Sequence, residues 1–200
     1  MRIERLAGIG CLLLMAAAQA PGQERELAVG LENSQVVPFT VLAQAQATAA
    51  RIYAGIGVKL IWRSKASTEI WMQFDTGVAA DVHPGAIGYA MPYGRTGTRI
   101  HILPERVDGT GSRRLGTILL GHVMAHELGH VLEGLNRHSE SGVMKARWDD
   151  GDLDEMLVRP LSFSSTDAEW IHEGLAKRAL QAGLRPPAAE RKDQAARNRE

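Results

Sequence analysis

The sequence predicts a single α+β domain over residues 36–183, in which a small mixed sheet packs against helices. The chain has 200 residues and a mass of 21.7 kDa, which leaves room for one domain. Hydrophobic residues make up 44% of it, a share typical of folded proteins rather than disordered ones. The local patterns follow the order strand, helix, several strands, long helix, loop and helix, which is typical of an α+β domain.

Charge and cysteine content exclude several classes of function. The chain has 23 Lys+Arg and 23 Asp+Glu, and this zero net charge argues against a nucleic-acid binder with a basic face. The single cysteine, Cys11, lies in a leader that we expect to be removed. The mature chain is therefore expected to have no intrachain disulfide, no thiolate metal site and no cysteine nucleophile.

Residues 1–20 have the pattern of a secretory signal peptide. Two arginines precede an apolar run over 6–18 that is too short to span a bilayer, and Ala18-Gln19-Ala20 has the form of a cleavage site. We therefore expect a secreted or periplasmic protein with no stable membrane insertion after signal removal. A cut a few residues earlier, a lipoprotein anchored at Cys11 and a buried N-terminal helix are the alternatives.

The first half of the chain is predicted to contain most of the strands. Residues 21–35 are polar and are predicted to be a lead-in. Residues 35–42 are rich in β-formers and predict a first strand, with Pro38 at an edge or at the strand start. An alanine-rich helix over 43–54 follows and ends at Gly55. The other predicted strands cover 58–62, 70–74, 86–91 and 99–103, and a loop over 76–85 lies between the second and the third of them.

Two helices are predicted in the second half. Ser112 can cap a long helix over 113–133, which Gly134 closes. After a break over 160–165, Thr166 and Glu169 would form the capping box of a last helix that runs to about Ala182. The polar residues 184–200 are predicted to be a disordered tail.

An acidic stretch lies between these two helices. Asp150, Asp152 and Asp154 alternate as in a calcium-binding loop. However, Glu155 replaces the glycine that such a loop requires, and no register supplies its final glutamate. We therefore predict a solvated acidic loop, with calcium binding as the lesser alternative.

The most informative segment is the H-E-x-x-H motif formed by residues 126–130. Side chains four residues apart lie on one helix face, so His126 and His130 can bind one metal ion. Zinc is the natural ion for two imidazoles with an open position. Glu127 lies beside them, where it can take a proton from a water that zinc has acidified. A helix with two ordinary histidines and a glutamate on a polar face is the alternative.

Zinc needs a third protein ligand, for which His138 is the best candidate. His122 extends the series, but it lies about 12 Å along the helix axis from His130, whereas ligands of one zinc lie within about 4 Å of one another. We expect His122 to pack or hydrogen-bond behind the site, and Glu133 to point at best obliquely at it. Because Gly134 lets the chain turn back, His138 can approach the ion.

This segment resembles the zinc-binding segment of metzincin metallopeptidases and is nearest to the matrixins. The shared features are H-E-x-x-H, a helix-ending glycine, a further histidine followed by serine, and the later Ser141-Gly142-Val143-Met144. The usual pattern is H-E-x-x-H-x-x-G-x-x-H, but here Gly134 comes one residue late and His138 two. The strict positions hold Glu133 and Asn136, so either the turn carries a two-residue insertion or the third ligand is another residue.

The resemblance implies a metzincin or zincin-like catalytic domain, with a small mixed twisted sheet, an active-site helix and a C-terminal helix. It would cover about residues 36–182, although only 126–144 is diagnostic. It also implies that Met144 packs beneath the zinc ligands without binding metal. The ligands of Zn²⁺ would be His126, His130 and His138.

The function so implied is that of a secreted zinc metalloendopeptidase, whose partner is a peptide or protein substrate. Glu127 would act as general base and later protonate the leaving amine, and a strand over 86–91 would pair with the extended substrate. Two alternatives stay open. One is a gluzincin-type peptidase with Glu169 or Glu173 as third ligand, and the other is a non-catalytic, zinc-stabilised binding protein.

A structural zinc, which matrixins also carry, is a further alternative. The remaining candidates for its ligands are Asp81, His83 and His101, and Tyr89 stands where another histidine would be needed. We expect these to be ordinary polar residues of a loop and of strands.

Overall fold

The computed structural model describes residues 25–33, 36–64, 68–76, 88–94, 97–107 and 112–184. The predicted signal peptide and the predicted tail beyond residue 184 lie outside these ranges. Among the residues within them, no helix is both long and apolar enough to cross a membrane.

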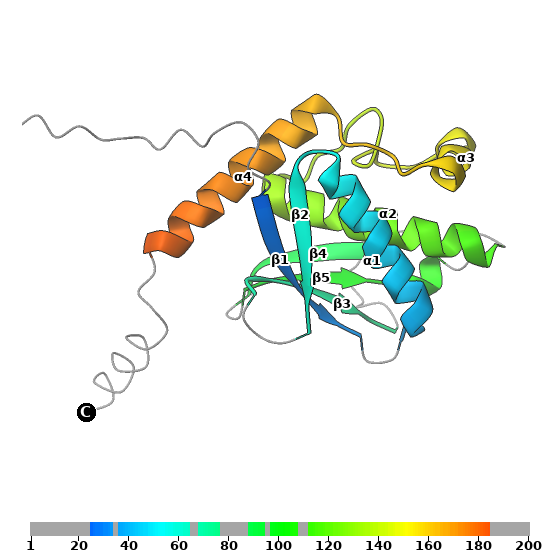
Figure 1. Cartoon of the computed structure of the whole chain (residues 1–200), viewed down its shortest axis with the longest axis horizontal. Coiled ribbons are helices and arrows are strands. Elements are labelled where there is room, and N and C mark those ends of the chain that lie inside the picture. Colours follow the sequence, from blue (N-terminus) through cyan, green and yellow to red (C-terminus); the bar gives the residue numbers. More distant parts are fainter. Residues whose placement is uncertain are drawn as a thin grey trace, which may run out of the picture.

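A five-stranded mixed sheet forms one layer of the protein (Figure 1). Its strand order is β2-β1-β3-β5-β4, in which β4 pairs antiparallel with β5 and the other pairs are parallel. This sheet and the helices beside it confirm the predicted α+β fold class. The strands are β1 (Arg25–Glu32), β2 (Val58–Arg63), β3 (Ile70–Phe74), β4 (Gly88–Gly94) and β5 (Gly97–Ile102).

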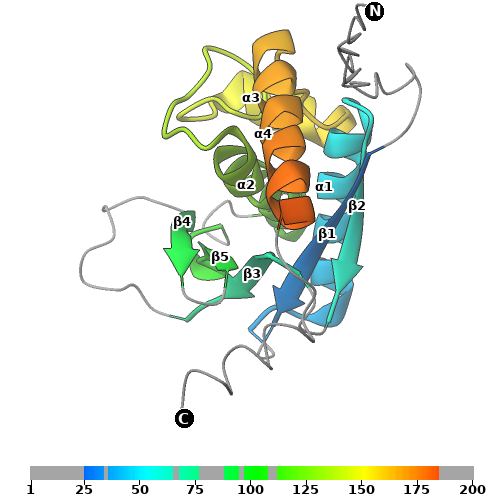
Figure 2. The same cartoon turned by 90° about the vertical axis from the view of Figure 1, so that its left-hand side faces the viewer.

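Helices form the second layer, and Figures 1 and 2 show α1 and α2 side by side on one side of the sheet. The fourth helix packs on α2 next to the C-terminal end of α2, where Gly174 approaches Leu132. A short 3-10 helix, η1 (Pro104–Arg106), follows the last strand. The α-helices are α1 (Phe39–Ala54), α2 (Arg113–Glu133), α3 (Asp150–Val158) and α4 (Ser165–Leu184).

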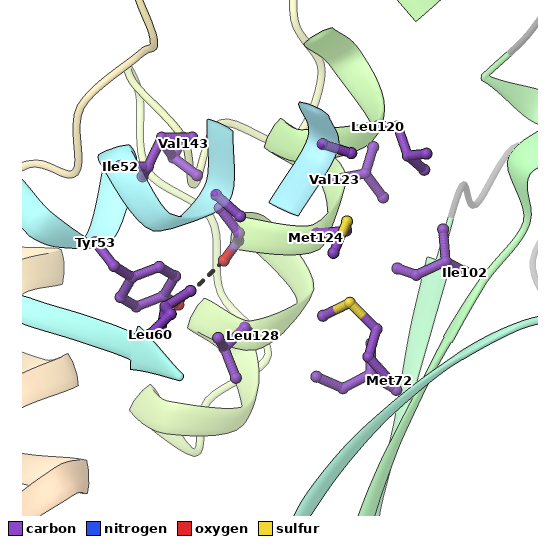
Figure 3. Close-up of a cluster of buried hydrophobic side chains, with 14 of the residues drawn as sticks. Ile52, Tyr53, Leu60, Met72, Ile102, Leu120, Val123, Met124, Leu128 and Val143 are labelled. Atoms are coloured by element: carbon purple, nitrogen blue, oxygen red, sulfur yellow. Dashed lines mark hydrogen bonds between the residues drawn. The ribbon is translucent and has the colours of Figure 1, made fainter. Parts of the chain in front are cut away.

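The core lies between the sheet and the α1–α2 pair. Figure 3 shows Met72 and Ile102 of the sheet facing Met124 and Leu128 of α2, and all four side chains are buried. The hydroxyl of the buried Tyr53 donates a hydrogen bond of 3.1 Å to the Ala125 carbonyl, which joins α1 to the middle of α2 (Figure 3). The helix that carries H-E-x-x-H is therefore held rigidly by its neighbours.

The predicted first strand is wrong, and so is the predicted lead-in where it covers β1. Residues 25–32 form a central strand between β2 and β3, whereas the β-formers that follow Pro38 begin α1. Proline presets the backbone before a helix, and the Asn33 side chain makes hydrogen bonds with both the N–H and the carbonyl of Val37, at 3.0 and 2.7 Å. Phe39 is 83% exposed, so its side chain does not have the half-buried sheet surface that favours aromatic residues in strands.

The predicted acidic loop is also wrong, because Asp150–Val158 is α3. The Asp149 side chain caps this helix by accepting from the Asp152 N–H, and the Asp152 side chain accepts from the Asp149 N–H, so the two residues make a capping box. Lys145 binds both carboxylates at 2.5 Å. The acidic residues thus start a helix, where negative charge is favourable.

Most of the other element predictions are confirmed. The strand over 70–74 and the helix over 113–133 have the predicted bounds. Ser112 caps this helix, because its side chain accepts a hydrogen bond from the Leu115 N–H. The capping box of α4 is wrong, however, since Ser164 and Asp167 make the two reciprocal hydrogen bonds in place of Thr166 and Glu169.

Candidate metal centre and active site

Helix α2 supplies two of the three histidines that meet in the structure. His126 and His130 lie one turn apart, and Gly134 ends the helix in the left-handed conformation, with φ of 68°. The chain then reverses and brings His138 back to them. The ligand atoms of these three residues all lie within 4.8 Å of one another, and within the described ranges this is the group of that kind that could hold a metal ion.

The rings are arranged around a common point. The His138 ring lies 5.3 Å from that of His126, nearly parallel to it, and 5.0 Å from that of His130, nearly perpendicular to it. The Nε2 atoms of His126 and His130 are 2.9 Å apart. His126 and His130 are partly buried and His138 is exposed.

Hydrogen bonds fix the tautomers of the two helical histidines. Nδ1 of His126 faces the Val143 carbonyl at 2.8 Å, and Nδ1 of His130 faces the Leu135 carbonyl at 3.2 Å. Since a carbonyl only accepts, both Nδ1 atoms carry the hydrogen, and both Nε2 atoms present lone pairs.

These two lone pairs point at one another in a site where neither ring is readily protonated. Burial lowers the pKa of His126 to about 4 and also lowers that of His130. Two unprotonated nitrogens at 2.9 Å repel each other, and a cation bound by both would reverse this repulsion. The donor set of three imidazoles suits zinc. The residues therefore fit a zinc ion, with His126, His130 and His138 as the side chains that would hold it.

Glu127 lies beside the histidines and beneath the sheet edge. Its side chain is buried, and burial raises its pKa to about 7. A Cβ added at Gly88 of β4 would lie 2.8 Å from Cγ and 3.0 Å from Oε1 of Glu127. The start of β4 thus packs directly against the carboxylate, and the glycine leaves it room.

Met144 packs against α2. It is fully buried, and its Sδ would lie 2.5 Å from a Cβ added at Gly129, within the H-E-x-x-H motif. The residue before it supplies the carbonyl that orients His126. Ser139 donates its N–H to the Met144 carbonyl at 2.8 Å, which ties this segment to the third histidine.

His122 lies behind the site, as the sequence predicts. It is fully buried, donates from Nδ1 to the Ile118 carbonyl at 2.8 Å and accepts at Nε2 from the Leu161 N–H at 3.1 Å. Both ring nitrogens are therefore used, and burial lowers its pKa.

Sequence reasoning missed Trp148. Its ring lies edge-on to His126, with ring centroids 5.7 Å apart, and to His122 at 6.1 Å, and its Nε1 donates to the Gly142 carbonyl at 3.2 Å. No motif in the sequence marks this tryptophan.

Glu133, which occupies the strict position of the pattern's glycine, turns away from solvent. Its side chain is fully buried, Oε2 lies 3.5 Å from Nε of Arg137, and within the described residues neither carboxylate oxygen has a hydrogen-bond partner. Burial raises its pKa to about 7, although Arg137 opposes this shift. The carboxyl group therefore takes up a proton more readily in the folded chain than in the unfolded one.

Replacing Glu133 with glutamine should remove a pH dependence of stability. The folded-state pKa is raised, so Glu133 stabilises the wild type below pH 4.5, and this contribution is lost as the pH rises through about 7. The free energy of unfolding of Glu133→Gln, relative to the wild type, should therefore increase over this window by up to about 3 kcal/mol. Urea unfolding of both proteins without metal, from pH 5 to 8, measures it. Parallel curves would contradict the prediction.

The gluzincin-type ligands do not join the histidines. Glu169 and Glu173 lie exposed on α4, outside the three-histidine group, and Glu173 pairs with Lys177 at 3.4 Å. Of the candidates for a structural zinc, Asp81 and His83 lie outside the described residues. His101 instead pairs through Nδ1 with Asp75 at 2.5 Å and stacks on Tyr89.

One comparison with known proteins identifies the fold. No protein-family model matches the chain, and no curated protein sequence matches it. The solved structure of archaemetzincin from Methanopyrus kandleri is similar, with a TM-score of 0.52 and 15% sequence identity, over 78% of this chain and 98% of that chain. The fold is metzincin-like. Myroilysin is matched with a TM-score of 0.35 and 14% identity over 72% of this chain and 71% of that chain, values that do not establish a common fold.

The site lies where several of the elements described above converge. The sheet edge at β4, the middle of α2 and the chain around Met144 all contact the histidines or Glu127. At 15% sequence identity, the similarity to archaemetzincin concerns the fold and assigns no role to any residue.

Proposed function

We propose that the chain is a secreted zinc-dependent endopeptidase of the metzincin type. The observation that carries the proposal is the convergence of two unprotonated histidine nitrogens, 2.9 Å apart, next to the buried carboxylate of Glu127. His138 completes the ligand set in this proposal. The wider likeness to archaemetzincin in fold supports the same class.

When bound, zinc supplies a Lewis acid that polarises the scissile carbonyl and lowers the pKa of a water. Glu127 takes the proton from the attacking water at its carboxylate and then gives it to the leaving amine nitrogen. Its raised pKa of about 7 suits both steps, because a group that titrates near the working pH both accepts and donates readily. Helix α2 and Gly88 hold this carboxylate in place.

The substrate in this proposal is an extended peptide that lies along β4. This strand is the last in the sheet order, and Gly88 at its start touches Glu127. A peptide that adds a strand there would receive main-chain hydrogen bonds and would pass the carboxylate. A nucleic-acid substrate does not form part of the proposal.

The finer assignments rest on the sequence. Residues 1–20 support secretion, and Ser139 together with residues 141–144 supports the closer likeness to matrixins. N-terminal sequencing of protein recovered from the medium or periplasm tests the first. An intact N-terminus in the cytoplasm would overturn it.

The purified full-length chain, given zinc and a mixed peptide library, tests the activity. We expect cleavage within peptides, loss of cleavage on chelation and recovery when zinc is added back. His138→Ala should lose both zinc and activity. If the zinc-loaded wild type cleaves nothing, the peptidase proposal fails, and if His138→Ala retains zinc, the third ligand is another residue.

Adding a methyl group at Gly88 should impair catalysis without removing zinc. The new Cβ would approach Glu127 Cγ to 2.8 Å, so the carboxylate must move. A displacement of about 1 Å at a reacting group can cost about 100-fold, and we expect Gly88→Ala to lower kcat/KM by about 10- to 100-fold. Steady-state kinetics with zinc analysis measures this. Unchanged kcat/KM would mean that Glu127 adapts freely.

A further inference from the structure

Asp167, at the start of α4, holds the loop that carries His138 from both sides. The residue is fully buried. Its Oδ1 accepts a hydrogen bond of 2.6 Å from Nη2 of Arg137 and another of 2.6 Å from the Ser139 hydroxyl. Arg137 and Ser139 are the two residues next to His138 in the chain, so one carboxylate oxygen grips the loop immediately before and after the histidine.

The other oxygen of Asp167 anchors this grip to α4. Oδ2 accepts from the Ser164 N–H at 3.0 Å, and the Asp167 N–H donates to the Ser164 hydroxyl at 3.1 Å. The main-chain N–H of Ser164 thus fixes Oδ2 at the start of α4, and the Ser164 hydroxyl caps the helix. Oδ2 therefore binds the start of α4, and Oδ1 binds the loop that carries His138.

Arg137 contacts three neighbouring side chains, although its Nε has no hydrogen-bond partner among the described residues. Its guanidinium lies 3.8 Å over the Trp170 ring of α4, its Nη1 donates to the Ser139 hydroxyl at 3.1 Å, and its Nε lies 3.5 Å from the Glu133 carboxylate. A stacked and paired arginine of this kind has little freedom left. The longer turn between Gly134 and His138 is therefore closed by contacts from α4.

We propose that Asp167 is a positioning residue for the metal centre, which sets the place of His138 relative to His126 and His130. The inference rests on the zinc ligand set of the proposed function and adds a residue 28 positions beyond Ser139 in the chain to it. His138 is exposed and sits on a loop, so α2 alone does not fix it. Hydrogen-bond partners behind the ligands commonly contribute about 10- to 100-fold to metal affinity.

Zinc affinity measured by competition with a chelator tests the proposal on the full-length chain. We expect Asp167→Asn to weaken zinc binding by about 10- to 100-fold. Ser164→Ala is the matched control, because it removes a cap hydrogen bond from Asp167 and leaves both contacts of Oδ1 in place. Glu155→Gln, which breaks an exposed pair with Arg159, controls for loss of a surface charge. Both controls should bind zinc within about threefold of the wild type.

The visible spectrum of the cobalt-substituted protein gives a second readout, because its intensity reports coordination number and geometry. Asp167→Asn should change this spectrum, and Ser164→Ala should not. If Asp167→Asn does not fold, Ser139→Ala and Arg137→Met each remove one donor to Oδ1, and each should weaken zinc binding by several-fold while the helix cap stays intact.

The outcomes separate this inference from the proposed function. Loss of zinc by His138→Ala together with wild-type affinity in Asp167→Asn would overturn the positioning role alone. Equal weakening by Ser164→Ala and Asp167→Asn would overturn it too, since helix capping would then be the whole effect. Wild-type zinc affinity in His138→Ala would overturn the third ligand and the inference with it.

Discussion

Replacing Glu127 with glutamine is expected to lower kcat/KM by about 100- to 10,000-fold while zinc stays bound. Glutamine has nearly the same shape, so the packing against Gly88 and α2 is retained, but an amide does not take up a proton from water. Neither helical histidine depends on the carboxylate for its orientation, since Nδ1 of His126 and Nδ1 of His130 donate to main-chain carbonyls. The metal content should therefore equal that of the wild type.

Peptide cleavage kinetics and zinc analysis of the two proteins measure this effect. Glu155→Gln is a suitable control, because it makes the same chemical change at an exposed site on α3. Activity of Glu127→Gln close to that of the wild type would rule out a proton-transfer role for Glu127. Loss of zinc from the variant would show that the carboxylate also supports the metal site.

Replacing Gly142 with alanine should destabilise the protein by about 2–5 kcal/mol. The residue has φ of 77°, a conformation that costs an L side chain about 1–2 kcal/mol. Its new Cβ would lie 2.2 Å from the Ser162 carbonyl oxygen, a main-chain atom that already accepts from the Val143 N–H. Overpacking of this kind costs about 1–3 kcal/mol. Urea unfolding of the metal-free protein measures the sum.

Two other glycines serve as controls for this prediction. Gly134 has φ of 68° with nothing near a new Cβ, so Gly134→Ala should show the conformational cost alone, about 1–2 kcal/mol. Gly183 lies in α4 with open space around it, so Gly183→Ala should be neutral or stabilising by up to about 1 kcal/mol. If Gly142→Ala costs no more than Gly134→Ala, the Ser162 segment yields freely.

Zinc affinity should fall in Gly142→Ala as well. The carbonyl of Val143, the next residue, holds Nδ1 of His126, so a shift of this segment turns the ring.

The local signals in the sequence were the dependable ones. Ser112 and Gly134 mark the two ends of α2 because a cap hydrogen bond and a left-handed residue are properties of a few neighbouring atoms. The helical spacing of His126 and His130 then follows from geometry. The approach of His138 was predictable for the same reason, since the turn that returns it is only four residues long.

Errors arose where distant residues decide the structure. The strand β1 carries charged residues, and it lies inside the sheet because β2 and β3 pair with it, which no local pattern reveals. The acidic run is an exception, because the capping box of Asp149 and Asp152 that starts α3 is a local signal. The grip of Asp167 on the residues beside His138 joins positions 28 to 30 apart in the chain, beyond the reach of any motif.

The left-handed Gly134 has a consequence for how such sites are found. In this chain the helix ends one residue later than the strict pattern requires, and Asp167 and Trp170 of α4 bind the longer turn just before the third histidine. The number of residues between the second and third histidines can therefore differ with the length of the loop, while the three rings still come together in space. A search that demands a fixed interval discards such chains, and one that asks for a helix stop followed by a tethered histidine retains them.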